Sequence, residues 1–121
     1  MMFEDYTLKL LAYNTETIIA EKFETIIARG VLNTRAKDFY DIYMLVKIND
    51  YDKSVLKKAV EQTFRHRNSE WNNTIRNTIE DLSSNNNILD LWKKYQKTYK
   101  YAENISIDDI IANLKVIEKL L

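Results

Sequence analysis

Six charged residues, divided between the predicted helix at 15–29 and the start of the predicted helix at 35–48, form a candidate cluster of types that bind phosphate or metal ions. They are Lys22, Arg29, Arg35, Lys37, Asp38 and Asp41. Lysine and arginine bind phosphate as a point charge or as a fork, and aspartate binds a metal ion or orients a hydroxyl. A solvated helix face is the alternative, because Lys37 and Asp41 are spaced i,i+4 and Asp38 would complement a helix dipole. The residue types alone favour this alternative.

Three of these charges lie beside apolar residues rather than opposite them. Lys22 and Asp38 each directly precede a phenylalanine, and Asp41 directly precedes an isoleucine. A charge at the margin of a buried stripe loses hydration, so it usually has a partner of opposite sign. The spacing therefore suggests that these residues interact with one another.

Two segments in the second half of the chain carry further basic residues. Arg65, His66 and Arg67 end a predicted helix, where basic side chains complement the helix dipole. The run WKKYQKTYKY from Trp92 to Tyr101 interleaves aromatic residues with lysines, a pattern that can stack and hold single-stranded nucleic acid. Because its aromatic residues recur at i, i+3 and i+7 up to Tyr99, a buried helical stripe is the favoured interpretation.

The composition excludes several classes of site. The 121 residues include one glycine, no proline and no cysteine. A glycine-rich phosphate loop and a dinucleotide fingerprint need several glycines, and disulfide frameworks, zinc ribbons and thiol nucleophiles need cysteine. A single histidine excludes a histidine-rich metal centre, and a formal net charge of zero argues against a DNA-coating protein.

No targeting or membrane segment is expected. No apolar run approaches the roughly 18 residues of a membrane span, and the first residues, MMFEDYTLKLLAYN, lack the core of a signal peptide. We therefore expect a cytoplasmic protein without a membrane partner.

Helical periodicity dominates the chain and predicts an all-α fold of about six helices in one domain, residues 1–121. Residues 1–13 are the exception: weak period-2 alternation at 7–11 predicts an extended segment with an orphan strand. Helices are predicted over 15–29, 35–48, 53–66, from Asn68 to about Leu82, over 88–99 and from a capping box at Ser106 to the end, with a loop at 83–87. Successive helices are expected to pack antiparallel. On the first helix, Glu24 and Thr25 are expected to face away from the core.

The run ETIIAEKFETIIARGVLNTRAKDFYDIYML, residues 16–45, carries an ordered set of motifs. Ala20-Glu21-Lys22, Arg29-Gly30, Asn33-Thr34-Arg35 and Lys37-Asp38-Phe39-Tyr40-Asp41 follow one another within it. These motifs resemble the second half of the AbiEii/AbiGii toxin family of nucleotidyltransferase-like proteins. Later pieces, at 64–67, 91–97 and 101–106, are also similar to the family, so that the resemblance covers essentially the whole chain.

The resemblance implies a toxin of toxin–antitoxin or phage abortive-infection systems that uses a nucleoside triphosphate and Mg²⁺. Some members of the family transfer nucleotides to tRNA, which is the only indication of an RNA partner that the resemblance gives. By this resemblance Lys22 contacts the triphosphate and Asp38 serves catalysis. Arg35, Lys37 and Asp41 support the nucleotide-binding site.

The family's first half carries a Gly-Ser motif followed by paired aspartates that hold the metal, and the sequence has no Gly-Ser dipeptide. We therefore expect a stand-alone C-terminal helical half, with no metal or cofactor site of its own, that is inactive as a transferase by itself. The orphan strand would then be a cut edge of the catalytic sheet. An alternative is an interaction or regulatory module that binds an antitoxin, a separately encoded N-terminal half or nucleic acid, or that forms a homodimer through the exposed strand edge.

Overall fold

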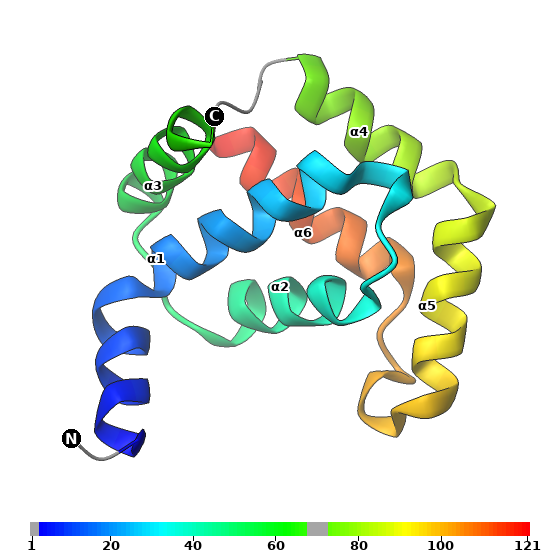
Figure 1. Cartoon of the computed structure of the whole chain (residues 1–121), viewed down its shortest axis with the longest axis horizontal. Coiled ribbons are helices and arrows are strands. Elements are labelled where there is room, and N and C mark those ends of the chain that lie inside the picture. Colours follow the sequence, from blue (N-terminus) through cyan, green and yellow to red (C-terminus); the bar gives the residue numbers. More distant parts are fainter. Residues whose placement is uncertain (1–2, 68–72) are drawn as a thin grey trace.

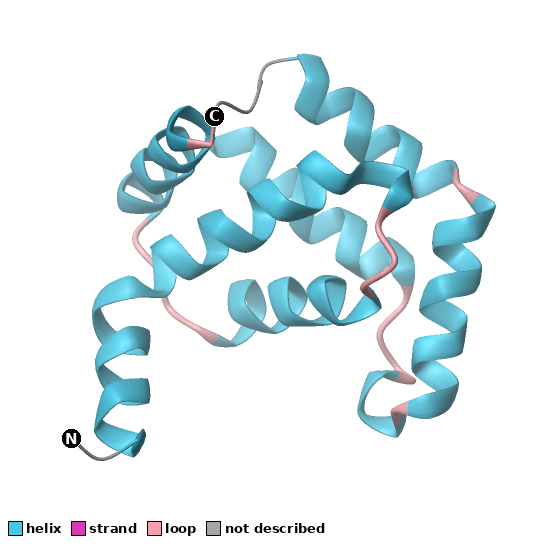
Figure 2. Cartoon of the chain, viewed as in Figure 1, coloured by secondary structure: helices cyan, strands magenta, loops and turns pink. Residues whose placement is uncertain are grey.

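Six α-helices and two short 3₁₀ turns form the part of the chain that the structure describes. This structure is a computed structural model; it describes the backbone of residues 3–67 and 73–121, and the side chains of 15–67 and 74–121. The elements are α1 (Phe3–Arg29), η1 (Gly30–Leu32), α2 (Ala36–Ile48), α3 (Lys53–His66), α4 (Asn73–Ser84), α5 (Asn86–Thr98), η2 (Lys100–Ala102) and α6 (Ile107–Leu120). The predicted all-α fold of about six helices is thus confirmed, and Figure 2 shows no strand among the described residues.

The expected N-terminal extended segment is wrong, because residues 3–13 form the first part of α1. No glycine or proline interrupts residues 3–29, so each residue added to the helix gains one backbone hydrogen bond without a new nucleation step. A strand at 7–11 would have needed a partner strand, and the described residues contain none. The hypotheses of a cut sheet edge and of a homodimer through that edge therefore lose their basis.

The predicted loop at 83–87 is also wrong, since Asn85 alone separates α4 from α5. The side-chain oxygen of Asn85 accepts a hydrogen bond from the backbone N–H of Ile88 at 3.0 Å and so caps α5. Ser83 and Ser84 donate hydrogen bonds from their hydroxyls to the carbonyl of Glu80 and thus remain in the last turn of α4. The predicted start of the fourth helix at Asn68 lies outside the described residues.

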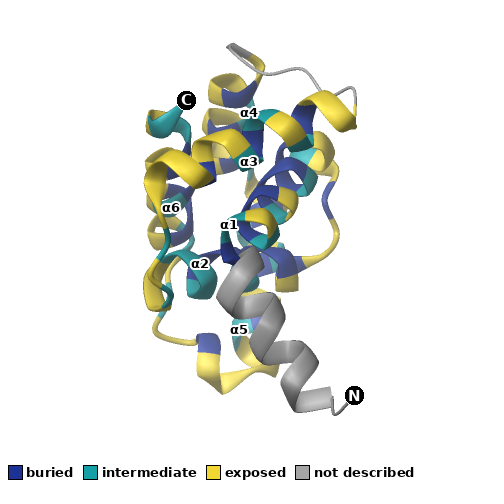
Figure 3. Cartoon of the chain, turned by 90° about the vertical axis from the view of Figure 1, so that its left-hand side faces the viewer, coloured by how far each residue is buried: buried dark blue, intermediate teal, exposed yellow. Residues whose placement is uncertain are grey.

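The helices surround one apolar core to which all six contribute. Its fully buried side chains include Phe23 of α1, Ile42 of α2, Leu56 of α3, Ile79 of α4, Trp92 of α5 and Ile110 of α6. Figure 3 shows the buried positions on the inward sides of the helices and the exposed positions outside. The predicted capping box is present at the start of α6, the last helix. The side chains of Ser106 and Asp109 each accept a hydrogen bond from the other residue's backbone N–H.

The packing of the helices is not sequential. The most extensive contacts join α1 with α3 and α2, and α6 with α4 and α2 (Figure 1). Within the described residues, α1 and α2 are the only successive helices that pack extensively, which contradicts the expected antiparallel packing of neighbours along the chain. No helix in the described ranges is both long and apolar enough to cross a membrane.

Candidate functional site

The candidate site lies where α2 begins to run alongside α1. Gly30 follows α1 with a φ of +52°, a left-handed conformation that L side chains rarely adopt, and starts η1. The side-chain oxygen of Asn33 then accepts a hydrogen bond from the backbone N–H of Arg35 at 2.8 Å and holds the chain just before α2. This turn brings the start of α2 to the end of α1.

Asp38 is the centre of the site. Its side chain is only 3% exposed, and Lys22 Nζ on α1 donates a hydrogen bond to its Oδ1 at 3.4 Å. Its second oxygen, Oδ2, faces Arg29 Nη1 at 3.7 Å and Arg35 Nε at 3.9 Å and accepts no hydrogen bond within the described residues. A buried carboxylate thus attracts three cations from two elements, which makes its burial possible.

Asp41, one helical turn after Asp38, shares Lys22 with it. Lys22 Nζ lies 3.2 Å from Asp41 Oδ2, and Lys37 Nζ lies 3.3 Å from the same oxygen. The i,i+4 pair with Lys37 is largely exposed and contributes little to stability. The structure therefore brings together all five residues that the resemblance selects, which are Lys22, Arg35, Lys37, Asp38 and Asp41, and it adds Arg29.

A pocket of about 240 Å³ opens beside this cluster. Four cationic residues and two carboxylates line it, together with Ile18 and Thr25; the charged residues are Glu21, Lys22, Arg29, Arg35, Asp38 and Arg67. The excess of cations, with two guanidinium groups and an ammonium group around one buried carboxylate, suits an anion that carries several oxygens.

Arg67 joins this cluster although the sequence gives no direct sign of it. Its Nη1 donates a hydrogen bond to Glu24 Oε1 at 2.6 Å and to Thr25 Oγ1 at 3.1 Å. Glu24 is buried, so the prediction that it faces away from the core is wrong. Periodicity considers one helix at a time and predicts that this flank of α1 faces solvent. In the structure, α3 packs against α1 there.

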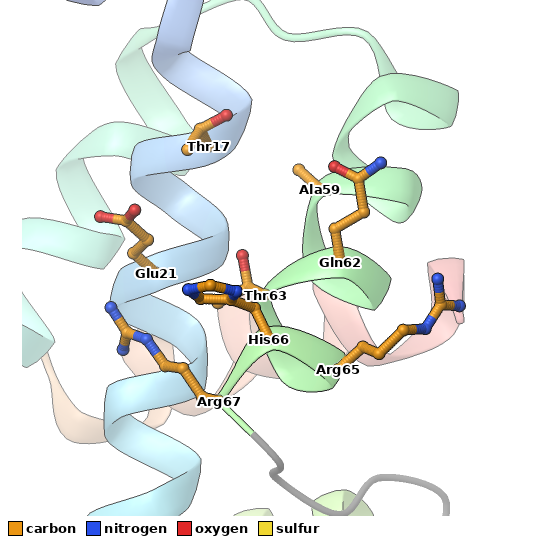
Figure 4. A pocket seen from close by; sticks show the side chains of 8 residues that line it. All are labelled: Thr17, Glu21, Ala59, Gln62, Thr63, Arg65, His66 and Arg67. Carbon is orange, nitrogen blue, oxygen red and sulfur yellow. The ribbon is translucent and has the colours of Figure 1, made fainter.

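A larger pocket of about 940 Å³ lies between α1 and the end of α3 (Figure 4). Arg65, His66 and Arg67 line it from α3 and its C-cap, and Thr17 and Glu21 line it from α1. Glu21 and Arg67 also line the smaller pocket, so the two hollows adjoin.

The side chains described around Asp38 do not form a Mg²⁺ site. The described residues contain no group of three or more His, Cys, Asp or Glu side chains that could hold a metal ion. The carboxylates of Asp38 and Asp41 already lie within 4 Å of lysine or arginine nitrogens, which oppose a divalent cation.

One Asp-x-Asp does occur, at Asp50, Tyr51 and Asp52, and it serves a different purpose. Asp52 caps α3 by accepting hydrogen bonds from the backbone N–H groups of Ser54 and Val55. The Ser54 hydroxyl and the Val55 backbone lower the pKa of the Asp52 carboxyl below its ordinary value.

The aromatic run from Trp92 to Tyr101 divides between two environments. Trp92 and Tyr95 are buried, as the helical stripe predicts, and Trp92 Nε1 donates to the carbonyl of Ile105 at 2.9 Å. The pKa of the Tyr95 hydroxyl is strongly raised. Burial is the largest cause, and the contact with the Tyr101 hydroxyl at 2.7 Å is the second. Tyr99, predicted to join the same stripe, is exposed because α5 ends at Thr98.

A protein-family model matches most of the chain. The family described as nucleotidyl transferase AbiEii toxin, type IV toxin–antitoxin system, matches residues 2–113. Searches of curated proteins and of solved structures find no match. Toxins of type IV systems have an antitoxin as their partner, so the family supports the expected antitoxin partner in general terms. Because the family match extends over nearly the whole sequence and includes every residue of the cluster around Asp38, the chain belongs to the AbiEii nucleotidyltransferase toxin family.

Proposed function

We propose that the pocket between α1 and the start of α2 binds the phosphate groups of a nucleoside triphosphate for nucleotidyl transfer. The observation that supports this proposal most directly is the convergence of Lys22, Arg29 and Arg35 on one 240 Å³ pocket. Nothing in the local sequence requires these residues to meet, since Lys22 and Asp38 are 16 positions apart. Membership of a nucleotidyltransferase family supplies the class of anion.

The burial of Asp38 supports a positioning role for this residue. Its oxygens lie within 4 Å of Lys22, Arg29 and Arg35, so the carboxylate holds three flexible cationic side chains in one region before a ligand binds. The resemblance assigns Asp38 to catalysis more broadly, and we propose that its contribution is made through these cations.

We further propose that the chain does not transfer nucleotides alone. Phosphoryl transfer needs carboxylates that hold Mg²⁺, and the described side chains offer no group that fits the ion. In this proposal those carboxylates come from outside this sequence, and the chain contributes the phosphate-binding helices.

Nucleotide binding is the first test. Lys22→Ala removes the ammonium group that bridges Asp38 and Asp41, and we expect it to weaken binding of a fluorescent nucleoside triphosphate about tenfold or more, because a charge-assisted hydrogen bond contributes about 1.5–3 kcal/mol. Fluorescence anisotropy measures the affinity. Lys57→Ala, which removes an exposed lysine of α3 outside the pocket, is the matched control. Equal affinities of the two variants would contradict the proposed pocket.

Nucleotide transfer is tested separately with labelled triphosphates, Mg²⁺ and bulk tRNA. We expect no incorporation of label by the 121-residue chain alone. Incorporation that disappears in Lys22→Ala would show that the chain is complete for catalysis and would reject the proposed dependence on outside carboxylates.

A further inference from the structure

Two exposed tyrosine rings lie at the corner where α5 ends and η2 begins. Tyr99 is 43% exposed and Tyr101 is 53% exposed, and their ring centroids are 5.4 Å apart. In Figure 1 this corner lies at the lower right, at the far end of α5 from α4. We call Tyr99 and Tyr101 the exposed tyrosine pair.

Two aromatic residues, the buried Tyr95 and the partly buried Tyr40, support the rings of the pair. Tyr99 packs on Tyr95 with a centroid distance of 4.7 Å, and Tyr101 packs on Tyr40 of α2 at the same distance. The hydroxyls of Tyr95 and Tyr101 are 2.7 Å apart, within hydrogen-bond distance. The rings are therefore fixed before any ligand arrives, and little side-chain entropy remains to be lost on binding.

The loop that follows the pair is fixed to α5 as well. Trp92 Nε1 and Gln96 Nε2 both donate to the carbonyl of Ile105, at 2.9 and 2.7 Å. Both donors sit on α5, so the turn that carries Tyr101 is tied to the same helix that carries the buried aromatic residues. The corner is a rigid surface rather than a flexible loop tip.

Four lysines surround the pair along the chain, and no acidic residue lies between positions 91 and 102. Lys93, Lys94, Lys97 and Lys100 are all exposed, and none forms an ion pair with the side chains that the structure describes. The formal net charge of the whole chain is zero, so this segment concentrates positive charge that the rest of the molecule balances.

We propose that the exposed tyrosine pair and these lysines bind single-stranded nucleic acid. Two adjacent rings offer faces on which unpaired bases stack, and the lysines offer contacts to the phosphates between those bases. Base stacking selects a single strand, because the bases of a duplex are already stacked on one another. Neither tyrosine of the pair lines the pocket around Asp38, and the proposal does not depend on nucleotide binding there.

The test measures binding of a fluorescent single-stranded oligouridylate to the full chain by anisotropy. Tyr99→Ala is expected to weaken binding about tenfold, because stacking contributes about 1–3 kcal/mol per base, whereas Tyr99→Phe keeps the ring and the affinity. Because Tyr99 is exposed and lies at the end of α5, neither change removes a buried side chain, and circular dichroism checks the fold.

The lysines are tested through salt dependence. Lys97→Ala and Lys100→Ala are each expected to reduce the slope of log affinity against log salt by about 0.7, the value for one phosphate contact on a single strand. The control Lys57→Ala, on α3, is expected to leave both affinity and slope unchanged.

Three outcomes would reject the proposal. The first is that Tyr99→Ala and the unchanged chain bind the oligouridylate with equal affinity. The second is that the chain binds the single strand and its duplex with equal affinity. The third is that Lys22→Ala loses oligouridylate binding and Tyr99→Ala does not. The third would place the strand in the pocket around Asp38. Loss of binding in Tyr99→Ala with full binding in Lys22→Ala supports the proposal, even where the nucleotide test fails.

Discussion

At the scale of single residues, Asp38 combines burial with charge. Its carboxylate is almost fully enclosed, while the cations around it are partly exposed, with Lys22 at 31%. When such an ion pair is broken, the partly exposed cation regains water but the buried anion does not. The stability of the fold therefore depends more on how the anion is paired. Asp38 is therefore the member of the cluster on which folding depends most.

Asp38→Asn keeps the shape of the side chain and removes its charge. We expect a loss of about 1–3 kcal/mol in the free energy of unfolding, because the ion pairs of a buried charged group disappear and its hydrogen bond with Lys22 loses the acceptor's charge. Urea denaturation measures the change. Asp41→Asn, at a more exposed carboxylate, is the control and is expected to cost no more than about 1 kcal/mol. A larger effect at Asp41 than at Asp38 would contradict this ranking.

The sequence indicates part of this cluster and not the rest. Lys22 and Asp38 sit at the margins of apolar stripes, and that position alone predicts partners for them. Arg67 and Glu24 are 43 positions apart, and no local pattern relates them. Their contact depends on how α3 lies against α1, which is a property of tertiary packing rather than of either helix.

At the scale of elements, the α1–α2 connection determines whether the cluster exists. One glycine, a 3₁₀ turn and the Asn33 side chain reverse the chain within a few residues. The sequence predicts this connection well, because a glycine after the last periodic residue is a common end of a helix. Reasoning from short-range alternation or polarity fails at 1–13, where α1 already runs from Phe3, and at 83–87, where the break between α4 and α5 is Asn85 alone.

Gly30→Ala tests the connection. The φ of +52° at Gly30 costs a residue with a Cβ about 1–2 kcal/mol, and we expect the free energy of unfolding to fall by that amount. The added Cβ would meet Thr78 Cγ2 at 3.5 Å, an ordinary contact, so the cost arises from the backbone and not from a clash. Gly30→Asn, which tolerates the left-handed conformation, is expected to lose less, and thermal or urea melts compare the two. Equal losses of stability in the two variants would indicate that the cost arises from crowding of the added side chain rather than from the backbone conformation.

At the scale of the whole molecule, the described helices share one core. Buried residues of α1 to α6 form a single cluster, and the strongest helix contacts link elements that are distant in the sequence. Local periodicity predicts the number of helices and most of their inward faces. It does not predict which helices are neighbours, because several pairings bury the same stripes.

A single core predicts a single cooperative unfolding transition. In a Trp71→Phe background the remaining tryptophan, Trp92, is buried at the centre of the cluster and reports tertiary structure by fluorescence. We expect its urea transition to coincide with the loss of helix followed by circular dichroism. Separate midpoints would show that part of the bundle unfolds independently and would contradict a single-domain organisation.

In the proposed phosphate site, the carboxylates of Asp38 and Asp41 are internal counter-ions of Lys22. A phosphate that binds to Lys22 has to exchange places with a carboxylate that the protein itself provides, and not only with ions from solution. The free pocket is therefore partly neutralised in advance, which lowers its attraction for anions in general and rewards a ligand with several phosphate oxygens that can engage Lys22, Arg29 and Arg35 together. We therefore expect such a site to select ligands by the number of negative charges they carry rather than by the strength of any single contact.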